Sequence, residues 1–341
     1  RNERYIMSKK VLMTGGAGFI GHHLAENILL ETDYDIVCVD RLDCSGTIHR
    51  LKEIIDSDSG IKGNWKDRVS FVFHDLKAEI NSFTAARIGK VDYILHLAAG
   101  SHVDRSIEDP MSFVMDNVVG TANILNFARG LDGLELFVNF STDEVFGPAP
   151  KGVEYKEWDR YNSTNPYSAT KAGAEELGLA FANTYKLPLI TTHCMNVFGE
   201  RQHPEKFIPM CINKISKGES ITVHASSEGE PGKRHYIHAR NTSAAVLFLM
   251  EGKWEHREKY NIVGEKEVDN LQMAQCIADI LGKKLHYELL DFHSCRPGHD
   301  LRYALDGSKM REIGWSLPLS FEESLEKTIT WTLQNKRWLH V

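Results

Sequence analysis

The feature that most constrains this chain is a glycine-rich loop between two regular segments near its beginning. An apolar run over residues 11–14 predicts a buried strand, and helical periodicity follows over residues 19–31. Between them, residues 15–21 read Gly-Gly-Ala-Gly-Phe-Ile-Gly. Glycines let a backbone turn sharply and approach a pyrophosphate, which the free N–H groups of a helix N-terminus bind. Because both flanking elements are present, the loop predicts a dinucleotide site. The expected contacts are Gly15, Gly18, Phe19, Ile20 and Gly21.

An acidic residue ends the next apolar run. Residues 36–39 predict a second strand, and Asp40 follows it, 19 residues after Gly21. This spacing is close to that of a carboxylate that binds the adenosine ribose hydroxyls. A carboxylate there repels a 2′-phosphate, which favours NAD over NADP, although the neighbouring Arg41 could accommodate that phosphate.

Strand and helix patterns then alternate. Residues 69–73, 93–97 and 136–140 predict further strands, and residues 111–129 predict a helix. Such alternation is typical of an α/β fold, a doubly wound parallel sheet of the Rossmann type. Three residues at the ends of these strands are expected to line the cofactor site: Asp75, Leu76 and Ala98.

The alternation fades after about residue 195. We expect an NAD-binding domain over residues 1–195, with a return segment near residues 234–250, and a smaller, mainly substrate-binding domain over residues 196–341.

Composition excludes several classes of protein. A net charge of -7 gives no reason to expect nucleic acid or an anionic membrane as a partner, and no apolar run approaches the length of a membrane span. The six cysteines show no C-x-x-C spacing, and the histidines show no ligand spacing, so no metal site is predicted. Several cysteines lie in apolar runs, which favours reduced thiols and a cytoplasmic location.

An acidic pair follows the strand at residues 136–140. Thr142, Asp143 and Glu144 leave that strand at its carboxyl end, where open α/β sheets bind ligands. Two adjacent carboxylates resist ionising together, so one can keep its proton near neutral pH. A solvent-exposed acidic loop would have the same sequence pattern. An acid beside a base is also what a dehydration requires.

A tyrosine and a lysine open the next predicted helix, which runs to about residue 185. Tyr167 and Lys171 are four residues apart and therefore share a helix face. An ammonium near a phenol lowers the pKa of the phenol and makes it a usable base. The pair also arises by chance, but here it follows a dinucleotide loop and a hydroxyl at a strand end, in the right order.

These pieces resemble the extended short-chain dehydrogenase/reductases, and within that superfamily the dTDP-glucose 4,6-dehydratases. The resembling segments span nearly the whole chain: residues 14–21, 39–40, 101–107, 141–147, 167–171, 204–206 and 296–303. The Thr-Asp-Glu triplet is the specific part, since 4-epimerases of the superfamily usually carry small or hydroxyl residues there.

The resemblance implies roles for the catalytic residues. Tyr167 would be the base at the sugar 4-hydroxyl, which Thr142 would also bind, and Lys171 would support Tyr167 and contact the ribose. Asp143 would be the acid and Glu144 the base of the elimination. The cofactor would be NAD, and the reaction would convert an NDP-hexose, dTDP-glucose first of all, to the 4-keto-6-deoxy sugar and water.

The resemblance also implies substrate contacts and a dimer. The substrate contacts would be Ser101, His102, Asn196, Glu205, Lys206, Arg234, Arg296 and Tyr303. Members of the family form dimers through a four-helix interface, and the helix over residues 111–129 has more apolar side chains than a sheet can cover. They are Phe113, Val114, Val118, Leu125 and Phe127.

The chain departs from the family pattern in places, which leaves other substrates and enzymes open. Gly100 stands where the family usually has glutamate, and residues 234–238 replace an arginine-aspartate-tryptophan pattern. UDP-glucose or a less common nucleotide sugar therefore remains open as the substrate. The alternatives are a 4-epimerase, a UDP-glucuronate decarboxylase and, from a different class, a non-catalytic NAD-sensing protein. The last is disfavoured because both the tyrosine and the lysine are present.

Overall fold

The centre of the computed structural model, which describes residues 8–43, 45–57, 64–291 and 301–340, is a seven-stranded sheet. Its strands are β1 (Lys10–Thr14), β2 (Asp35–Asp40), β3 (Val69–Phe73), β4 (Tyr93–His96), β5 (Leu136–Thr142), β6 (Leu189–Cys194) and β10 (Lys259–Ile262). They lie in the order β10-β6-β5-β4-β1-β2-β3, and every pairing is parallel. This confirms the predicted α/β fold with a doubly wound parallel sheet.

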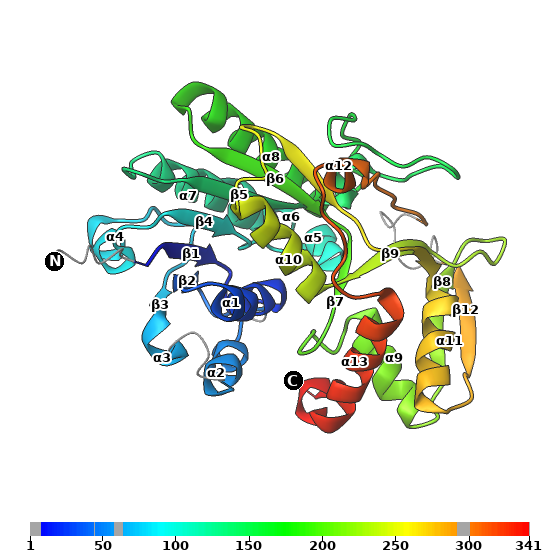
Figure 1. Cartoon of the computed structure of the whole chain (residues 1–341). Coiled ribbons are helices and arrows are strands. Elements are labelled where there is room, and N and C mark those ends of the chain that lie inside the picture. The colour runs from blue at the N-terminus through cyan, green and yellow to red at the C-terminus, as the bar shows by residue number, and fades with distance from the viewer. Residues whose placement is uncertain (1–7, 44, 58–63, 292–300, 341) are drawn as a thin grey trace.

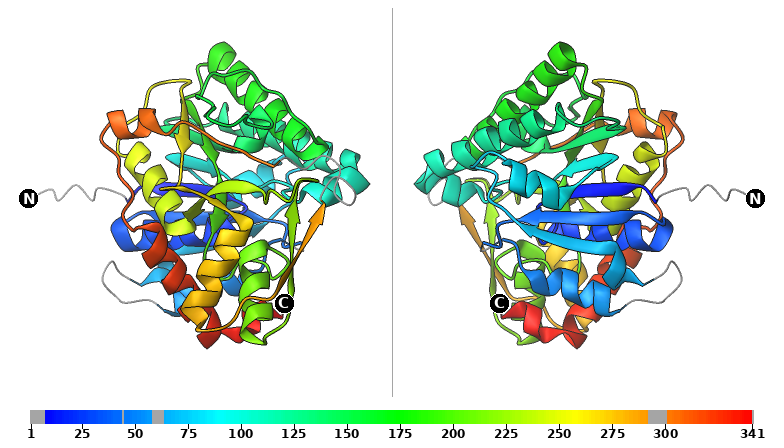
Figure 2. Two further views of the ribbon diagram at one scale, coloured as in Figure 1. Left: turned by 90° about the vertical axis from the view of Figure 1, so that its right-hand side faces the viewer. Right: turned by 90° about the vertical axis from the view of Figure 1, so that its left-hand side faces the viewer.

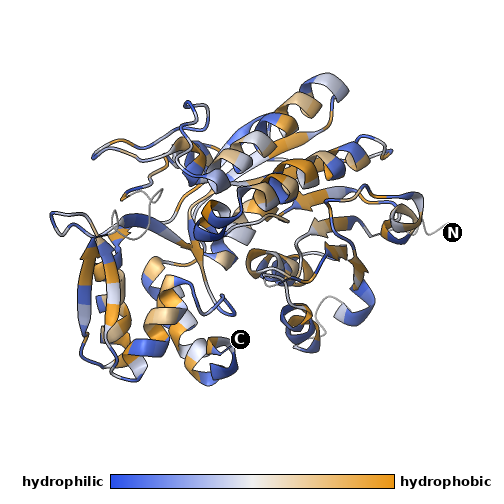
Figure 3. Ribbon diagram, turned by 180° about the vertical axis from the view of Figure 1, so that it is seen from behind, coloured by the Kyte–Doolittle hydropathy of each residue, from blue (hydrophilic) through white to orange (hydrophobic). Residues whose placement is uncertain are grey.

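Helices cover both faces of this sheet (Figures 1 and 2). On one face lie α1 (Phe19–Glu31) and α10 (Ala239–Met250), and on the other lie α7 (Gly120–Ala128) and α8 (Pro166–Tyr185). Side chains alternate between the faces, so Val11 and Met13 pack into the core beneath α1 while Leu12 packs into the opposite core. A sheet buried on both faces needs strands that are apolar throughout, and the strands in Figure 3 are largely so.

A smaller lobe with its own core lies beside the sheet (Figure 1, right). It contains α9 (Phe207–Ser216), β8 (Ile221–Ala225), α11 (Asn270–Leu281), β12 (Tyr287–Asp291) and α13 (Phe321–Gln334). A three-stranded sheet of β7 (Asn196–Phe198), β9 (Lys233–His238) and β11 (Glu267–Asp269) lies between the two parts. Among the described residues, no helix is both long enough and apolar enough to cross a bilayer.

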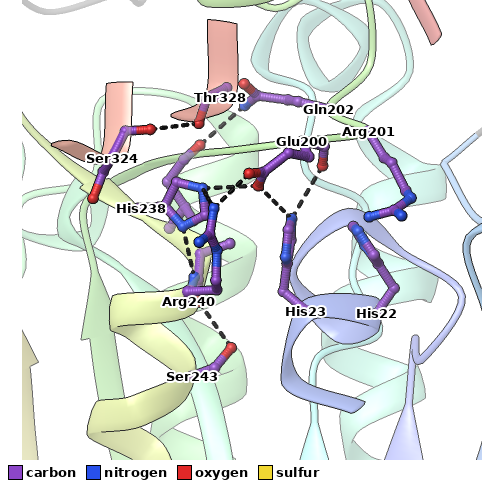
Figure 4. Close-up of polar contacts among 12 residues, drawn as sticks. His22, His23, Glu200, Arg201, Gln202, His238, Arg240, Ser243, Ser324 and Thr328 are labelled. Carbon is purple, nitrogen blue, oxygen red and sulfur yellow. Dashed lines mark hydrogen bonds and ion pairs between the residues drawn. The ribbon is translucent and has the colours of Figure 1, made fainter. Parts of the chain in front are cut away.

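A buried carboxylate next to the three-stranded sheet contacts the helix that follows the glycine loop (Figure 4). Glu200 lies 2.9 Å from Nε2 of His238 and 2.5 Å from Arg240, and its carbonyl oxygen lies 3.0 Å from Nε2 of His23 on α1. Burial alone would raise the pKa of Glu200, but the hydrogen bond and charge of His238 outweigh it and hold that pKa low. The carboxylate is therefore ionised and holds the loop after β7 in place.

The helix predicted over residues 111–129 is interrupted by a π-helical turn. It consists of α6 (Pro110–Phe113), a π-helix (Val114–Val119) and α7. Within the turn, Asn117 accepts a hydrogen bond from the amide of Gly100 at 2.7 Å and donates to Thr170 at 2.9 Å. Periodicity could not predict the turn, because these partners come from distant segments. Such turns are frequent at functional sites.

Candidate active site

A cavity opens at the carboxyl edge of the large sheet, where the strand order reverses between β1 and β4. Ligands of open α/β sheets bind at such a position. Every residue predicted to contact the cofactor lines this cavity: Gly15, Gly18, Phe19, Ile20, Gly21, Asp40, Asp75, Leu76, Ala98, Tyr167 and Lys171. Four predicted substrate contacts line it too: Ser101, His102, Glu205 and Lys206.

The glycine loop fits a pyrophosphate because side chains would fill its cradle. Gly15 has a φ of +70°, and a Cβ there would lie 2.8 Å from the amide nitrogen of Ala98. A Cβ on Gly21 would lie 2.4 Å from the carbonyl oxygen of Gly15. Gly18 is the N-cap of α1 and has no side chain to cap it, so the helix can offer its first N–H groups to an anion.

The groups at the end of β2 distinguish NAD from NADP. Asp40 accepts hydrogen bonds from the amides of Ala17 at 3.1 Å and Leu42 at 2.9 Å, which fix its carboxylate beside the loop. Arg41 forms a two-pronged ion pair with Asp116, with distances of 2.5 and 2.8 Å, and its Nε donates to Asp43 at 2.7 Å. Because carboxylates already occupy the guanidinium, Arg41 is not arranged to receive a 2′-phosphate.

The acidic pair lies where β5 leaves the sheet. Thr142 is the last residue of the strand, and a short 3₁₀-helix (Asp143–Phe146) follows. Thr142 donates to Oδ1 of Asp143 at 3.0 Å, whereas Oδ2 of Asp143 is buried and has no hydrogen-bond partner among the described residues. Oε2 of Glu144 accepts from Asn165 at 3.3 Å. The two carboxyl groups thus differ: Asp143 has a buried oxygen without a partner in the described part of the chain, and Glu144 accepts a hydrogen bond from Asn165.

Burial places both carboxyl groups in the neutral pH range. It raises the pKa of Asp143 to about 6, although the charge of Arg234 opposes the rise. Burial and the charge of Asp143 together raise the pKa of Glu144 to about 7. Groups coupled this closely titrate as a pair, so near neutrality the pair holds one proton for much of the time.

Tyr167 and Lys171 lie on one face of α8, which begins at the N-cap Asn165 and has Pro166 in its first turn. Burial and the Glu144 charge raise the pKa of Tyr167, and a hydrogen bond with Thr142 lowers it. Lys171 donates to the carbonyl oxygen of Phe140 at 2.6 Å, and burial lowers its pKa to about 8. Tyr167 therefore needs positive charge nearby before it can act as a base.

Three of the remaining predicted substrate contacts are not among the residues that line the cavity: Asn196, Arg234 and Tyr303. Arg234 stacks on the ring of Tyr303 at 4.5 Å, and its charge opposes the rise in pKa of both Asp143 and Glu144. Asn196 is exposed at the start of β7. Arg296 lies outside the described residues.

Other residues of the site carried no motif in the sequence. Asn117 holds the backbone of Gly100, and Asn165 contacts Glu144. Asn165 precedes a proline at a helix start, which is an N-cap signal that could have identified it. Arg105 and His203 also line the cavity, but they come from loops whose position only the folded chain fixes.

The fold and the cavity define a Rossmann-type enzyme that binds NAD and works on a second ligand at the sheet edge. The sequence model of the family described as GDP-mannose 4,6 dehydratase matches residues 12–328. The chain belongs to this family. The predicted resemblance, the dehydratase class and the NAD cofactor are confirmed.

Individual relatives agree. The chain is 35% identical over 355 residues to the dTDP-glucose 4,6-dehydratase of Escherichia coli, covering 97% of this chain and 94% of that protein. The crystal structure of the dTDP-glucose 4,6-dehydratase from Streptomyces venezuelae, with NAD and dTDP bound, matches with a TM-score of 0.83 and 32% identity over 96% of this chain and 98% of that one. The crystal structure of a UDP-glucose 4-epimerase from Thermus thermophilus, in complex with NAD, matches with a TM-score of 0.82 and 26% identity. The match covers 94% of this chain and 98% of that one.

Replacing Gly21 by alanine tests the glycine cradle. The added Cβ meets the carbonyl oxygen of Gly15 at 2.4 Å, so the loop must shift away from the pyrophosphate position. We expect NAD binding to weaken roughly tenfold or more, about 1.4 kcal/mol, in calorimetry of protein stripped of nucleotide. Gly130→Ala is the matched control, because its nearest contact is an ordinary 3.5 Å. Equal affinity in both variants would contradict the cradle.

Proposed function

We propose that this chain converts dTDP-glucose to dTDP-4-keto-6-deoxyglucose and water. The observation that carries the proposal is the pair of Asp143, which is buried, and Glu144, which is half-buried, beside Tyr167, with both carboxyl pKa values raised toward neutrality. The nucleotide and sugar are those named for the relatives from Escherichia coli and Streptomyces venezuelae. NAD, when bound, takes a hydride from C4 of the sugar and returns it at C6.

Tyr167 is the group that removes the proton of the 4-hydroxyl in this mechanism. Thr142 lies beside the phenol and binds the same hydroxyl, so the proton has a defined path to the tyrosine oxygen. Burial holds the phenol neutral. Lys171, one helical turn away on α8, and a bound nicotinamide ring would supply the positive charge that opposes burial. Oxidation at C4 leaves a ketone, which acidifies the hydrogen on C5.

Asp143 and Glu144 then carry out the two proton transfers of the elimination. Asn165 donates to Glu144, which favours its ionised form, and Glu144 takes the C5 proton. Oδ2 of Asp143, which is buried and has no partner among the described residues, carries the proton that the departing 6-hydroxyl needs. Both carboxyl groups have pKa values near neutral pH, so their acid and base forms coexist there. Proton transfer is efficient under that condition. Arg234 and Lys206 supply positive charge near the pair and, we propose, bind the substrate diphosphate.

Tyr167→Phe should retain NAD and bind substrate yet lose turnover. General base catalysis is worth ~10²–10⁴ in rate, so we expect kcat to fall by about that factor. The measurement is product formation at saturating substrate, with nucleotide content and thermal unfolding as checks on folding. Tyr155→Phe is the control, because Tyr155 is not among the residues that line the cavity and its hydroxyl donates to the carbonyl oxygen of Pro148. A Tyr167→Phe enzyme close to the wild-type rate would remove Tyr167 from the mechanism.

Substrate deuterated at C4 separates the dehydratase from an epimerase on the same fold. A dehydratase moves the hydride from C4 to C6, so the product should carry deuterium on its methyl group, as mass spectrometry and NMR would show. An epimerase returns the label to C4, and a simple dehydrogenase loses it to free NADH. Either of those results would overturn the proposed reaction.

We also propose that the enzyme is a cytoplasmic homodimer that pairs through the helices around residues 103–128. Of the five apolar side chains named for the predicted helix, Phe113 and Leu125 are buried within the chain, and Val114, Val118 and Phe127 are half-buried. The apolar side chains left exposed on these helices are Ile107, Met111 and Met115, and Met111 is 64% exposed. A symmetric copy would cover them. We expect light scattering at micromolar concentration to give twice the mass of one chain, and Met111→Glu to halve it. A monomeric wild type would exclude the dimer.

A further inference from the structure

A fully buried carboxylate lies one helical turn beyond Lys171 on α8, and the catalytic roles proposed above leave it unused. Glu175 is 1% exposed, and its two oxygens contact four other residues. Oε1 accepts a hydrogen bond from the hydroxyl of Ser141, and Oε2 accepts one from Tyr161. Nε2 of His193 lies 3.1 Å from Oε2, and Nζ of Lys259 lies 3.5 Å from it.

The hydrogen bonds of His193 show that its ring faces an acceptor on both sides. Asn261 donates through Nδ2 to the carbonyl oxygens of Tyr155 and Asp306, both at 3.0 Å, so its Oδ1 is the atom that faces Nδ1 of His193 at 2.9 Å. Nε2 faces the Glu175 carboxylate. Each ring nitrogen of His193 therefore lies within hydrogen-bond distance of an acceptor oxygen.

Glu175 is ionised in this environment. Burial alone would raise its pKa, but the charges of His193 and Lys259 and the hydrogen bond from Ser141 outweigh burial and lower the pKa to about 2. A buried carboxylate is costly unless it is paired and hydrogen-bonded, and this one is both.

The contacts connect two catalytic elements. Ser141 immediately precedes Thr142 on β5, and Glu175 lies on the same helix as Tyr167 and Lys171. Ser141 is also the register partner of His193 on β6. The carboxylate thus joins the strand end that carries the acidic pair to the helix that carries the tyrosine and the lysine.

The carboxylate also acts on the charge of Lys171. The titratable groups that face this ammonium are Tyr167 and Glu175 on its own helix, Cys194 on β6 and His96 on β4. Burial lowers the pKa of Lys171, and among the groups that oppose burial Glu175 has the largest effect.

We propose that Glu175 is a positioning residue, which fixes the end of β5 against α8 and places a negative charge one helical turn from Lys171. This inference rests on the proposed function of Tyr167 and Lys171. A purely structural role, in which Glu175 only holds the sheet together, predicts a loss of thermal stability without any change in the pH dependence of turnover.

Glu175→Gln tests the inference, with Glu176→Gln, at the exposed neighbour on the same helix, as the matched control. The amide removes the negative charge, so Lys171 should lose its proton at lower pH and the alkaline limb of the kcat profile should move to lower pH by about one unit. Misplacement of the acidic pair should reduce kcat by roughly 10- to 100-fold with KM nearly unchanged. Glu175→Asp keeps the charge but retracts it from Ser141, so its alkaline limb should stay in place while kcat falls.

The outcomes separate this inference from the proposed function. A wild type that dehydrates its substrate, with a folded Glu175→Gln variant that has the same kcat and pH profile, would overturn the role of Glu175 alone. A wild type that dehydrates no nucleotide sugar would overturn the proposed function. In that case, NMR titration of ¹⁵N-labelled lysine, with Lys171→Met to assign the signal, still tests the charge. An unchanged Lys171 titration in Glu175→Gln, or in Glu175→Ala if the amide variant does not fold, would overturn the inference.

Discussion

β5 pairs in parallel with β4 on one side and β6 on the other, and this register decides where every reacting group can lie. Parallel strands end at a common edge, so Thr142 leaves the sheet beside the cofactor cavity rather than at the opposite end. Because side chains alternate along a strand, a slip of one residue would exchange Ser141 with its neighbours and turn its hydroxyl away from Glu175. The glycine loop, the acidic pair and α8 meet because this ladder brings their attachment points together.

The acidic side chains near this edge show that the surroundings of a carboxyl group decide its charge. Burial raises the pKa of Asp143, and burial together with the charge of Asp143 raises the pKa of Glu144. Glu175 is at least as deeply buried, yet its pKa falls, because His193 and Lys259 surround it. The first arrangement keeps protons available for exchange, and the second fixes a permanent negative charge behind the site. The pKa of Glu200, in the loop after β7, is lowered in the same way, because the hydrogen bond and charge of His238 outweigh burial.

Much of the fold could be predicted because its signals are local. The helix predicted over residues 19–31 has those bounds in the structure, and the strand predicted over residues 69–73 has them too. The π-helical turn at 114–119 and the return of β10 to the large sheet were not predicted. Both depend on contacts between segments far apart in the chain, namely Asn117 with Gly100 and Lys259 with Thr191. Patterns read from neighbouring residues cannot predict contacts between segments that are far apart in the chain.

The sequence by itself determined the dinucleotide loop, the acidic pair at a strand end and the Tyr–Lys helix, because each is a short pattern whose chemistry follows from spacing alone. Only the tertiary structure decided the state of these groups. Arg41 could have received a phosphate by its position in the sequence, but Asp116, 75 residues away, occupies its guanidinium. In the sequence, Glu175 has no feature that separates it from other glutamates in helices. In the fold, residues of β5, β6 and β10 surround its carboxylate. Charge and hydrogen bonding depend on distance in space and on exclusion of water, and the chain sets neither until it has folded.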